Sequence, residues 1–391
     1  MSYIGSKPAD AVLETDDIAD GVVTSEKIAD GTITTADLSF TPVSNPFRNI
    51  IINGDMSLAQ RSTSVSSITA PGYNTVDRFR TSISSAGTWT QSQDTTVPSA
   101  QGFAKSLKMD CTTADGSLSA GDYLIISQKI EGQNLQYLKK GTSSAESTTL
   151  SFWVRSNKTG TYIAELEDSD NSRTISKSYT VSSADTWEKK TLTYAGDTTG
   201  AFNNDNGNSL QLNFWLAAGT TYTSGTLATS WESTTSANRA VGQVNLADST
   251  ANEWYVTGVQ LEAGTSASDF EFLPHDVNLQ RCQRYYYLHV EGTSNSPVGT
   301  GTYYNASELN VVVFFPTNMR TSPTLLSASG SNYFRSNTNG ASDDVDDFLL
   351  GTSFETIAQI YNTTDASGTA GTAGYVRTNN ASAYIAFQAE L

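Results

Sequence analysis

Two strand-length runs follow one another in the middle of the chain, TTLSFWVRS at residues 148–156 and TYIAELEDS at residues 161–169. Both are rich in Thr, Tyr, Ile, Val and other residues that pack well on a pleated surface. The residues between them, NKTG, favour a turn. This succession of short apolar or alternating runs and polar turns predicts antiparallel β-structure.

The same pattern recurs towards the C-terminal side of these runs. Further strand-length segments are TWEKKTLTYAG (186–196), SLQLNFWLAAG (209–219) and EWYVTGVQLEAG (253–264). No stretch between them carries a convincing helical period. Short strands at this spacing predict an antiparallel sandwich, which we place at residues 48–275.

The last part of the chain predicts a second, smaller β-sandwich at residues 276–391. DVNLQRCQR (276–284) reads as one or two helical turns with Asp276 as the N-cap. The strand candidates that follow are YYYLHVEG (285–292), LNVVVFFPT (309–317), SNYFRSN (331–337) and SAYIAFQAEL (382–391). We therefore expect an all-β protein in which this smaller sandwich follows the first.

The first 40 residues contain a repeat with a period of ten, IADGVVTSEK at 18–27 and IADGTITTAD at 28–37. Within it, apolar residues recur every five positions, at Leu13, Ile18, Val23, Ile28, Ile33 and Leu38. One chain of this length cannot bury them, but several chains around a shared axis can. We interpret residues 1–40 as a fibrous oligomerisation and attachment segment, most readily of a homotrimer, followed by a linker at 41–47. A disordered arm is the alternative.

The charge of the chain argues against several classes of partner. Its formal net charge is −17, with 40 acidic and 23 basic residues. Binding to nucleic acid or to an anionic membrane requires the opposite balance. No apolar run is long enough to insert into a membrane, and no secretory h-region is visible, so we expect synthesis in the cytoplasm. Two widely separated cysteines, Cys111 and Cys282, indicate neither a disulfide scaffold nor a zinc site.

Four motifs in order along the chain resemble a family of phage and prophage tail fibre proteins. They are FRNIIINGDMSLAQRS (47–62), GYNTVDRF (72–79), WYVTGVQLEAG (254–264) and FEFLPHDVNLQRCQRYYY (270–287). The N-terminal YIGSKP and the repeated Asp-Gly stretches also resemble the attachment ends of podovirus-type tail fibres. The resemblance implies a virion tail protein that contacts other tail proteins through its N-terminus. It also implies a host polysaccharide or outer-membrane receptor as partner, with residues 276–391 as the receptor-facing tip.

Part of the same region is similar to jelly-roll carbohydrate-binding modules. The similarity rests on NIIINGDM, LSFWVRS, the LTYAG strand and WYVTGVQLE. It implies that residues 48–275 form a two-sheet jelly roll. Such a fold can bind sugar or serve as a spacer, so the resemblance alone does not imply a ligand.

Two kinds of side chain are candidates for ligand binding. Trp89 and Trp231 lie outside the clearest strand patterns and are the surface candidates for stacking on a glycan. The other four tryptophans lie inside strand patterns and are expected in the core, namely Trp153, Trp187, Trp215 and Trp254. Sugars are held by such aromatic faces together with a few polar groups.

An acidic cluster near the C-terminus has two interpretations. ASDDVDDFLLG (341–351) places four aspartates close together, at Asp343, Asp344, Asp346 and Asp347. Oxygen ligands of this kind suit weakly bound calcium, although the spacing is not that of an EF-hand loop. The alternative is a solvated acidic loop. We expect no other cofactor.

These observations favour a structural subunit of a phage tail fibre that attaches the virion to the host surface through glycans. A virion adaptor or decoration protein without a ligand is the alternative, and a glycan-cleaving tail enzyme is the least favoured. The chain has two histidines and no nucleophile–base spacing. Acidic residues are too common for a glycosidase pair to stand out. We therefore expect no enzymatic activity.

Overall fold

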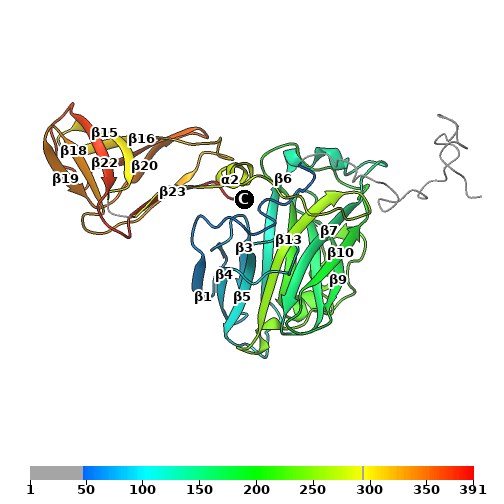
Figure 1. Ribbon diagram of the computed structural model, residues 1–391. Coiled ribbons are helices and arrows are strands. Elements are labelled where there is room, and N and C mark those ends of the chain that lie inside the picture. Colours follow the sequence, from blue (N-terminus) through cyan, green and yellow to red (C-terminus); the bar gives the residue numbers. More distant parts are fainter. Residues whose placement is uncertain (1–46, 293–294) are drawn as a thin grey trace, which may run out of the picture. The chain divides into compact units, whose positions relative to one another are not determined.

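The protein is described here by a computed structural model, which covers residues 47–292 and 295–391 (Figure 1). Regular structure in these residues is nearly all β, so the predicted fold class is confirmed. Phe47–Leu391 forms one compact unit. The six apolar positions from Leu13 to Leu38, and the predicted linker apart from Phe47, lie outside the described residues.

The first half of this unit is a jelly-roll sandwich of two antiparallel sheets (Figure 1). One sheet has six strands in the order β1 (Ser64–Ile68), β4 (Thr88–Asp94), β5 (Ser106–Thr113), β13 (Glu253–Ala263), β7 (Thr148–Ser156) and β10 (Glu188–Tyr194). The other has seven, in the order β12 (Glu232–Ser233), β9 (Arg173–Val181), β8 (Gly160–Asp168), β11 (Asn208–Ala218), β6 (Tyr123–Glu131), β3 (Arg80–Ser84) and β2 (Gly72–Tyr73).

Side-chain alternation along β7 shows why this sequence forms a sandwich. Leu150, Phe152 and Val154 are fully buried in the core between the sheets. Trp153 and Arg155, which alternate with them, are only partly buried. A strand with this pattern can cover a core with one face only, and full burial of each apolar side chain contributes about 1.5–3 kcal/mol.

The C-terminal part has its own pair of sheets and its own hydrophobic core. A three-stranded sheet has the order β14 (Tyr286–Glu291), β23 (Tyr384–Gln388) and β17 (Thr324–Ser327). A seven-stranded sheet has the order β19 (Ala341–Val345), β18 (Phe334–Thr338), β22 (Ala373–Thr378), β15 (Pro297–Asn305), β16 (Glu308–Phe314), β21 (Ile357–Asn362) and β20 (Leu349–Ser353). Phe334, Ile360 and Phe387 lie at the centre of the core.

The predicted short helix is present as α2 (His275–Gln283). Its N-cap position is Pro274, and Asp276 lies within the first turn, so the expectation that Asp276 caps the helix is wrong. Pro274 fixes the extended backbone that precedes the first turn. Further along, Cys282 and Tyr285 pack against Ile52 and Leu58 of the jelly roll.

The remaining helical segments in the described residues are short. They are α1 (Thr220–Thr223), η4 (Gly132–Asn134), η5 (Gln136–Leu138), η6 (Ser236–Asn238) and η7 (Leu246–Asp248). Within the described residues, no helix has the length and apolar character that crossing a membrane requires.

Candidate functional site

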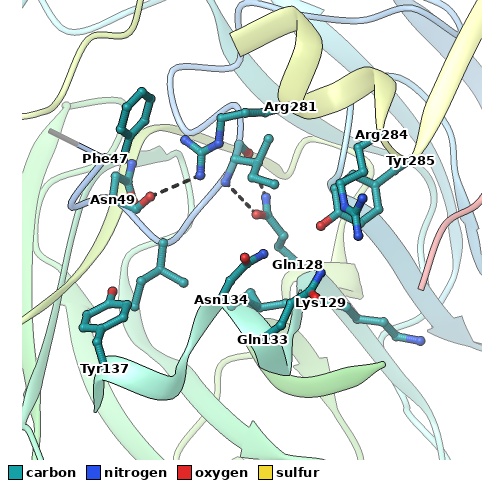
Figure 2. Close-up of a pocket in the computed structure, with 13 residues that line it drawn as sticks. Phe47, Asn49, Gln128, Lys129, Gln133, Asn134, Tyr137, Arg281, Arg284 and Tyr285 are labelled. Atoms are coloured by element: carbon teal, nitrogen blue, oxygen red, sulfur yellow. Dashed lines mark hydrogen bonds between the residues drawn. The ribbon is translucent and has the colours of Figure 1, made fainter. Parts of the chain in front are cut away.

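A pocket of about 460 Å³ opens where three segments distant in sequence meet (Figure 2). Residues 47–52 form one wall, the end of β6 with η4 and η5 forms the floor, and α2 with the residues after it forms the other wall. Its lining is Phe47, Asn49, Ile50, Ile52, Gln128, Lys129, Ile130, Gln133, Asn134, Tyr137, Arg281, Arg284 and Tyr285.

The floor takes its shape from two consecutive 3-10 turns. Leu135 and Leu138, three residues apart, are buried in the jelly-roll core. Because residues three apart lie on the same side of a 3-10 turn, anchoring these two leucines directs their neighbours outward. Asn134 and Tyr137 are accordingly exposed, with 49% of Tyr137 accessible to solvent.

The wall formed by residues 47–52 is fixed to the sheet below it. The side-chain amide of Gln128 accepts a hydrogen bond from the Ile52 N–H (2.8 Å) and donates one to the Ile52 carbonyl (2.9 Å). Asn49 accepts hydrogen bonds from the N–H groups of Ile51 and Leu261. The side-chain amides of Gln128 and Asn49 therefore hold the wall in place through hydrogen bonds to the main chain.

The opposite wall is held by a buried ionic network. Arg284 Nε and Nη2 each lie 2.7 Å from a carboxylate oxygen of Glu131, and the Tyr285 hydroxyl donates to the same carboxylate. Burial alone would raise the pKa of Glu131, but the hydrogen bonds from Arg284 and Tyr285 lower it overall. Glu131 therefore stays ionised and ties the end of β6 to the residues after α2.

The groups that remain available to a ligand are aromatic rings and amides. Phe47 is 58% exposed, and Figure 2 shows Asn134 and Tyr137 lying on the floor below it. The Asn134 side chain makes no hydrogen bond within the described part of the chain. Gln133 is exposed as well and donates to Glu131 at 2.6 Å. An apolar ring face beside free hydrogen-bonding groups is the combination that recognises a sugar.

Trp89 is wrongly predicted as a surface residue. It is fully buried in the jelly-roll core, and its indole N–H donates to the Ala86 carbonyl at 2.7 Å. The physical reason is the alternation of β4, which turns Trp89 and Gln91 inward. In this position Trp89 presents no ring face to a ligand.

Trp231, the second tryptophan candidate, is partly buried. Its indole N–H donates to the Ala195 carbonyl at 2.8 Å, and its ring packs against the jelly-roll core. The Lys140 ammonium lies 5.3 Å from the ring centroid. Trp231 does not line the pocket at η4 and η5, and its role in glycan contact stays a prediction.

Two tryptophans expected in the core are only partly buried, and one of them lines another pocket. Trp153 borders a pocket of about 340 Å³ that also contains Phe103, Phe270 and Phe272. Trp187 is likewise partly buried, with its ring centroid 6.2 Å from that of Tyr255. The other two, Trp215 and Trp254, are fully buried as expected.

The predicted acidic cluster lies on and after β19, and its members have protein partners. Asp344 forms an ion pair with Arg335, and Asp343 accepts hydrogen bonds from the Tyr303 hydroxyl and the Ser367 N–H. Asp346 accepts from the Asn332 N–H at 2.7 Å, and the main-chain oxygen of Asp347 accepts from Asn362 at 3.0 Å. Within residues 47–292 and 295–391, no group of three or more His, Cys, Asp or Glu is placed to hold a metal ion. Calcium binding therefore stays a prediction.

One pair of carboxylates merits comparison with a glycosidase site. Arg239 contacts both Glu165, at 2.7 and 2.9 Å, and Glu167, at 2.6 Å. Glu165 is fully buried and also accepts hydrogen bonds from Thr174, Asn213 and Trp215. In this arrangement the Glu165 carboxylate is shielded from a polymeric substrate.

The pocket residues Asn134, Tyr137 and Arg281 were not predicted from the sequence. Each belongs to a different local pattern, and they meet only when β6 and α2 are assembled. One local signal was present. In GQNLQYLKK (132–140), the aromatic residue Tyr137 follows a strand and is surrounded by amide side chains. A residue in such a polar loop does not have to be part of the core.

Fold and pocket together define an all-β protein with a jelly-roll sandwich that carries an open pocket of aromatic and polar residues. No protein-family model and no curated protein matches the sequence. Similar solved structures include the enzymatically active domain of bacteriophage CBA120 tailspike protein 4, at 15% identity and a TM-score of 0.30. That match covers 56% of this chain and 22% of the tailspike chain, so this chain spans about a fifth of it.

Carbohydrate-binding modules also have similar structures. A CBM4 module has 13% identity and a TM-score of 0.28, with 54% of this chain and 97% of the module covered. TmCBM61, solved in complex with β-1,4-galactotriose, has 10% identity and a TM-score of 0.29, with coverages of 55% and 99%.

Proposed function

We propose that this chain is a structural subunit of a phage tail fibre that attaches the virion to the host bacterial surface by binding surface glycans. The observation that carries the glycan-binding part is the pocket in which Tyr137 and Phe47 present ring faces beside the free amide of Asn134. The tail-fibre part is supported by the resemblance of residues 47–62, 72–79, 254–264 and 270–287 to such proteins.

Sugar recognition suits the chemistry of this pocket. A pyranose ring has apolar C–H faces that stack on aromatic rings, and equatorial hydroxyls that both donate and accept hydrogen bonds. The amide of Asn134 can serve both functions, and Tyr137 offers the ring. An open pocket of about 460 Å³ has room for one or two sugar rings while a longer glycan extends into solvent.

The rest of the proposal concerns the assembled particle. The chain forms a homotrimer through residues 1–40, which also fix it to other tail proteins, and it is part of the virion after synthesis in the host cytoplasm. The chain binds its ligand without catalysing a reaction. Calcium binds weakly at Asp343, Asp344, Asp346 and Asp347. The alternative is an adaptor or decoration protein that has no ligand.

A second contact surface on the C-terminal sandwich is favoured by its exposed side chains. Val312 and Phe314 on β16 and Tyr375 on β22 are 49%, 73% and 43% exposed. The strand β15 lies between β16 and β22. Its residue Thr300 is opposite Tyr375 of β22, and the next residue, Gly301, is opposite Val311 of β16. Val312 and Tyr375 therefore lie on either side of Thr300. A receptor-facing tip would use this face of the sheet.

Glycan binding can be tested with the full-length chain on an array of bacterial surface polysaccharides. We expect Tyr137→Ala to abolish binding to the glycans that the unaltered protein recognises. Phe272→Ala is the matched control, because Phe272 is 51% exposed in the same sandwich but does not line this pocket.

The control variant should bind like the unaltered protein. If Tyr137→Ala keeps full binding while Phe314→Ala loses it, the contact lies on the C-terminal sandwich. If the unaltered chain binds no bacterial glycan, the adaptor alternative is favoured.

A further inference from the structure

The lining of the pocket at η4 and η5 is unusual in its charge. Its charged members are Lys129, Arg281 and Arg284, and none of the described residues that line it is an Asp or a Glu. The chain as a whole has a formal net charge of −17. A locally cationic pocket in an acidic protein needs a specific reason, because a neutral sugar does not require it.

The three cations differ in how they are compensated. Arg284 has the carboxylate of Glu131 at 2.7 Å, so its charge is neutralised inside the protein. Lys129 donates to the main-chain oxygen of Leu391 at 3.1 Å and extends away from Arg281 (Figure 2). Arg281 donates to the carbonyl of Asn49 at 3.3 Å, and within the described residues it forms no ion pair with a carboxylate.

The acidic group that interacts electrostatically with Arg281 already has other hydrogen-bond partners. The Glu271 carboxylate accepts hydrogen bonds from the N–H groups of Phe47 (2.6 Å) and Asn49 (2.9 Å), and it lies 4.0 Å from Arg48. Arg281 is therefore a partly buried guanidinium, and its remaining N–H donors make no hydrogen bond within the described residues and are open to the pocket. Burial lowers the pKa of Arg281, and the nearby Glu271 carboxylate opposes this shift only in part.

The guanidinium group of Arg281 determines which chemical group of a ligand it can bind. Its planar fork of N–H donors matches a carboxylate or a phosphate, which it can bind through two parallel hydrogen bonds. An oxyanion at this position would satisfy the open donors and compensate the charge. Figure 2 shows Arg281 on the wall above the floor that carries Asn134 and Tyr137, so one ligand can reach all three.

We propose that the glycan bound in this pocket carries an oxyanion, either the carboxylate of a uronic acid or a phosphate ester, and that Arg281 binds it. This inference rests on the proposed function, since it assigns the class of sugar to the same site. Tyr137 binds the ring face, and Arg281 distinguishes acidic from neutral sugars.

The carboxylate form can be tested by titrating the full-length chain with oligogalacturonate and with the same oligosaccharide after chemical reduction of its carboxyl groups. The phosphate form is tested with a phosphomannan before and after dephosphorylation. We expect one charged ligand of these two pairs to bind at least about tenfold more tightly than its neutral counterpart. Tighter binding of oligogalacturonate identifies the oxyanion as a carboxylate, and tighter binding of phosphomannan identifies it as a phosphate ester.

Arg281→Gln should remove this preference, so that each charged ligand binds no more tightly than its neutral form. Arg281→Lys, which keeps the charge but loses the planar fork, should retain part of the preference. Arg335→Gln on the C-terminal sandwich is the matched control and should behave like the unaltered protein. Thermal unfolding of each variant establishes that the fold is kept.

Two results would overturn this inference. One is an unaltered protein that does not distinguish either charged ligand from its neutral form. The other is an Arg281→Gln variant that keeps the full preference. If Tyr137→Ala nevertheless abolishes binding to neutral glycans, the proposed function stands and the assignment of an acidic sugar fails.

Discussion

Gly54 lies at one of the closest approaches between two backbone segments in the jelly roll. Its carbonyl accepts a hydrogen bond from the Val259 N–H at 2.9 Å, and a Cβ added to it would lie 2.0 Å from the Val259 carbonyl oxygen. We predict that Gly54→Ala lowers the free energy of unfolding by about 1–3 kcal/mol, because the backbone of β13 has to shift.

Urea unfolding checks this, with Gly116→Ala as the control. A Cβ at Gly116 would meet nothing within 4 Å, so that variant should be close to neutral. Equal destabilisation of both variants would contradict the close approach at Gly54.

Asp77 gives the jelly roll a predictable dependence on pH. Burial raises its pKa from 3.8 to about 6, although hydrogen bonds from Gln60 partly oppose the rise. The folded state therefore binds the proton more tightly than the unfolded state between about pH 4 and 6. In this window the contribution of Asp77 to stability increases as the pH falls, by at most about 3 kcal/mol.

The measurement compares urea unfolding of the unaltered protein and Asp77→Asn at several pH values from 7 to 4.5. The comparison is needed because carboxylates with a lowered pKa, such as Glu131 and Asp197, begin to lose stabilisation as the pH falls towards their unfolded-state pKa values of 4.5 and 3.8, at the lower end of this range. We expect the stability of the unaltered protein to rise relative to the variant as the pH falls. Parallel profiles would show that Asp77 titrates normally.

The tryptophans show what could be predicted for single residues. Trp215 and Trp254 were correctly assigned to the core, because they lie in long apolar runs. Trp89 was misassigned, since TWTQSQD (88–94) is too polar for its inward face to be recognised from composition. Trp153 was misassigned for the opposite reason, because it lies in an apolar run but on the face of β7 that points away from the core, where Trp153 and Arg155 are only partly buried.

At the scale of elements, buried charges join the jelly roll to the residues that follow α2 and β23. The Arg78 guanidinium lies 3.5 Å from the Tyr285 ring centroid and forms an ion pair with Glu390. Glu390 also accepts a hydrogen bond from Arg61 at 3.0 Å. Because Arg78 and Glu390 are nearly inaccessible, removing one charge leaves the other buried without compensation.

We therefore predict that Glu390→Gln lowers the free energy of unfolding by about 3–5 kcal/mol. The control is Glu146→Gln, which removes the exposed ion pair with Lys139 and should cost less than about 1 kcal/mol. Denaturation followed by tryptophan fluorescence measures both variants. Similar small effects would mean that water reaches the Arg78–Glu390 pair.

Strands were predictable from the sequence because their signal is local. The runs predicted at 148–156 and 253–264 are β7 (Thr148–Ser156) and β13 (Glu253–Ala263). The order of strands was not predictable, because β13 lies between β5 and β7 through contacts that no local pattern encodes. The pocket depends on that order, so its residues could not be brought together from the sequence.

At the scale of the whole molecule, the N-terminal repeat remains the predicted basis of assembly. Ile28 lies in the middle of the five-residue rhythm from Leu13 to Leu38. In a trimer, Ile28→Asp would place three like charges close to a shared axis, where desolvation and repulsion are both unfavourable.

We predict that Ile28→Asp weakens the trimer and its incorporation into particles, while the circular dichroism of the β-sandwiches is unchanged. Analytical ultracentrifugation measures the mass. A trimer of unchanged mass with normal incorporation would mean that the repeat has no part in assembly.

The central claim is that the pocket formed by β6, η4, η5 and α2 binds a glycan. The most direct test is an experimental structure of the full-length chain with the tightest-binding oligosaccharide from the array. We predict a sugar ring stacked on Tyr137, with an acidic substituent at Arg281. An oligosaccharide bound instead at Phe314 and Tyr375, with the pocket empty, would contradict the claim.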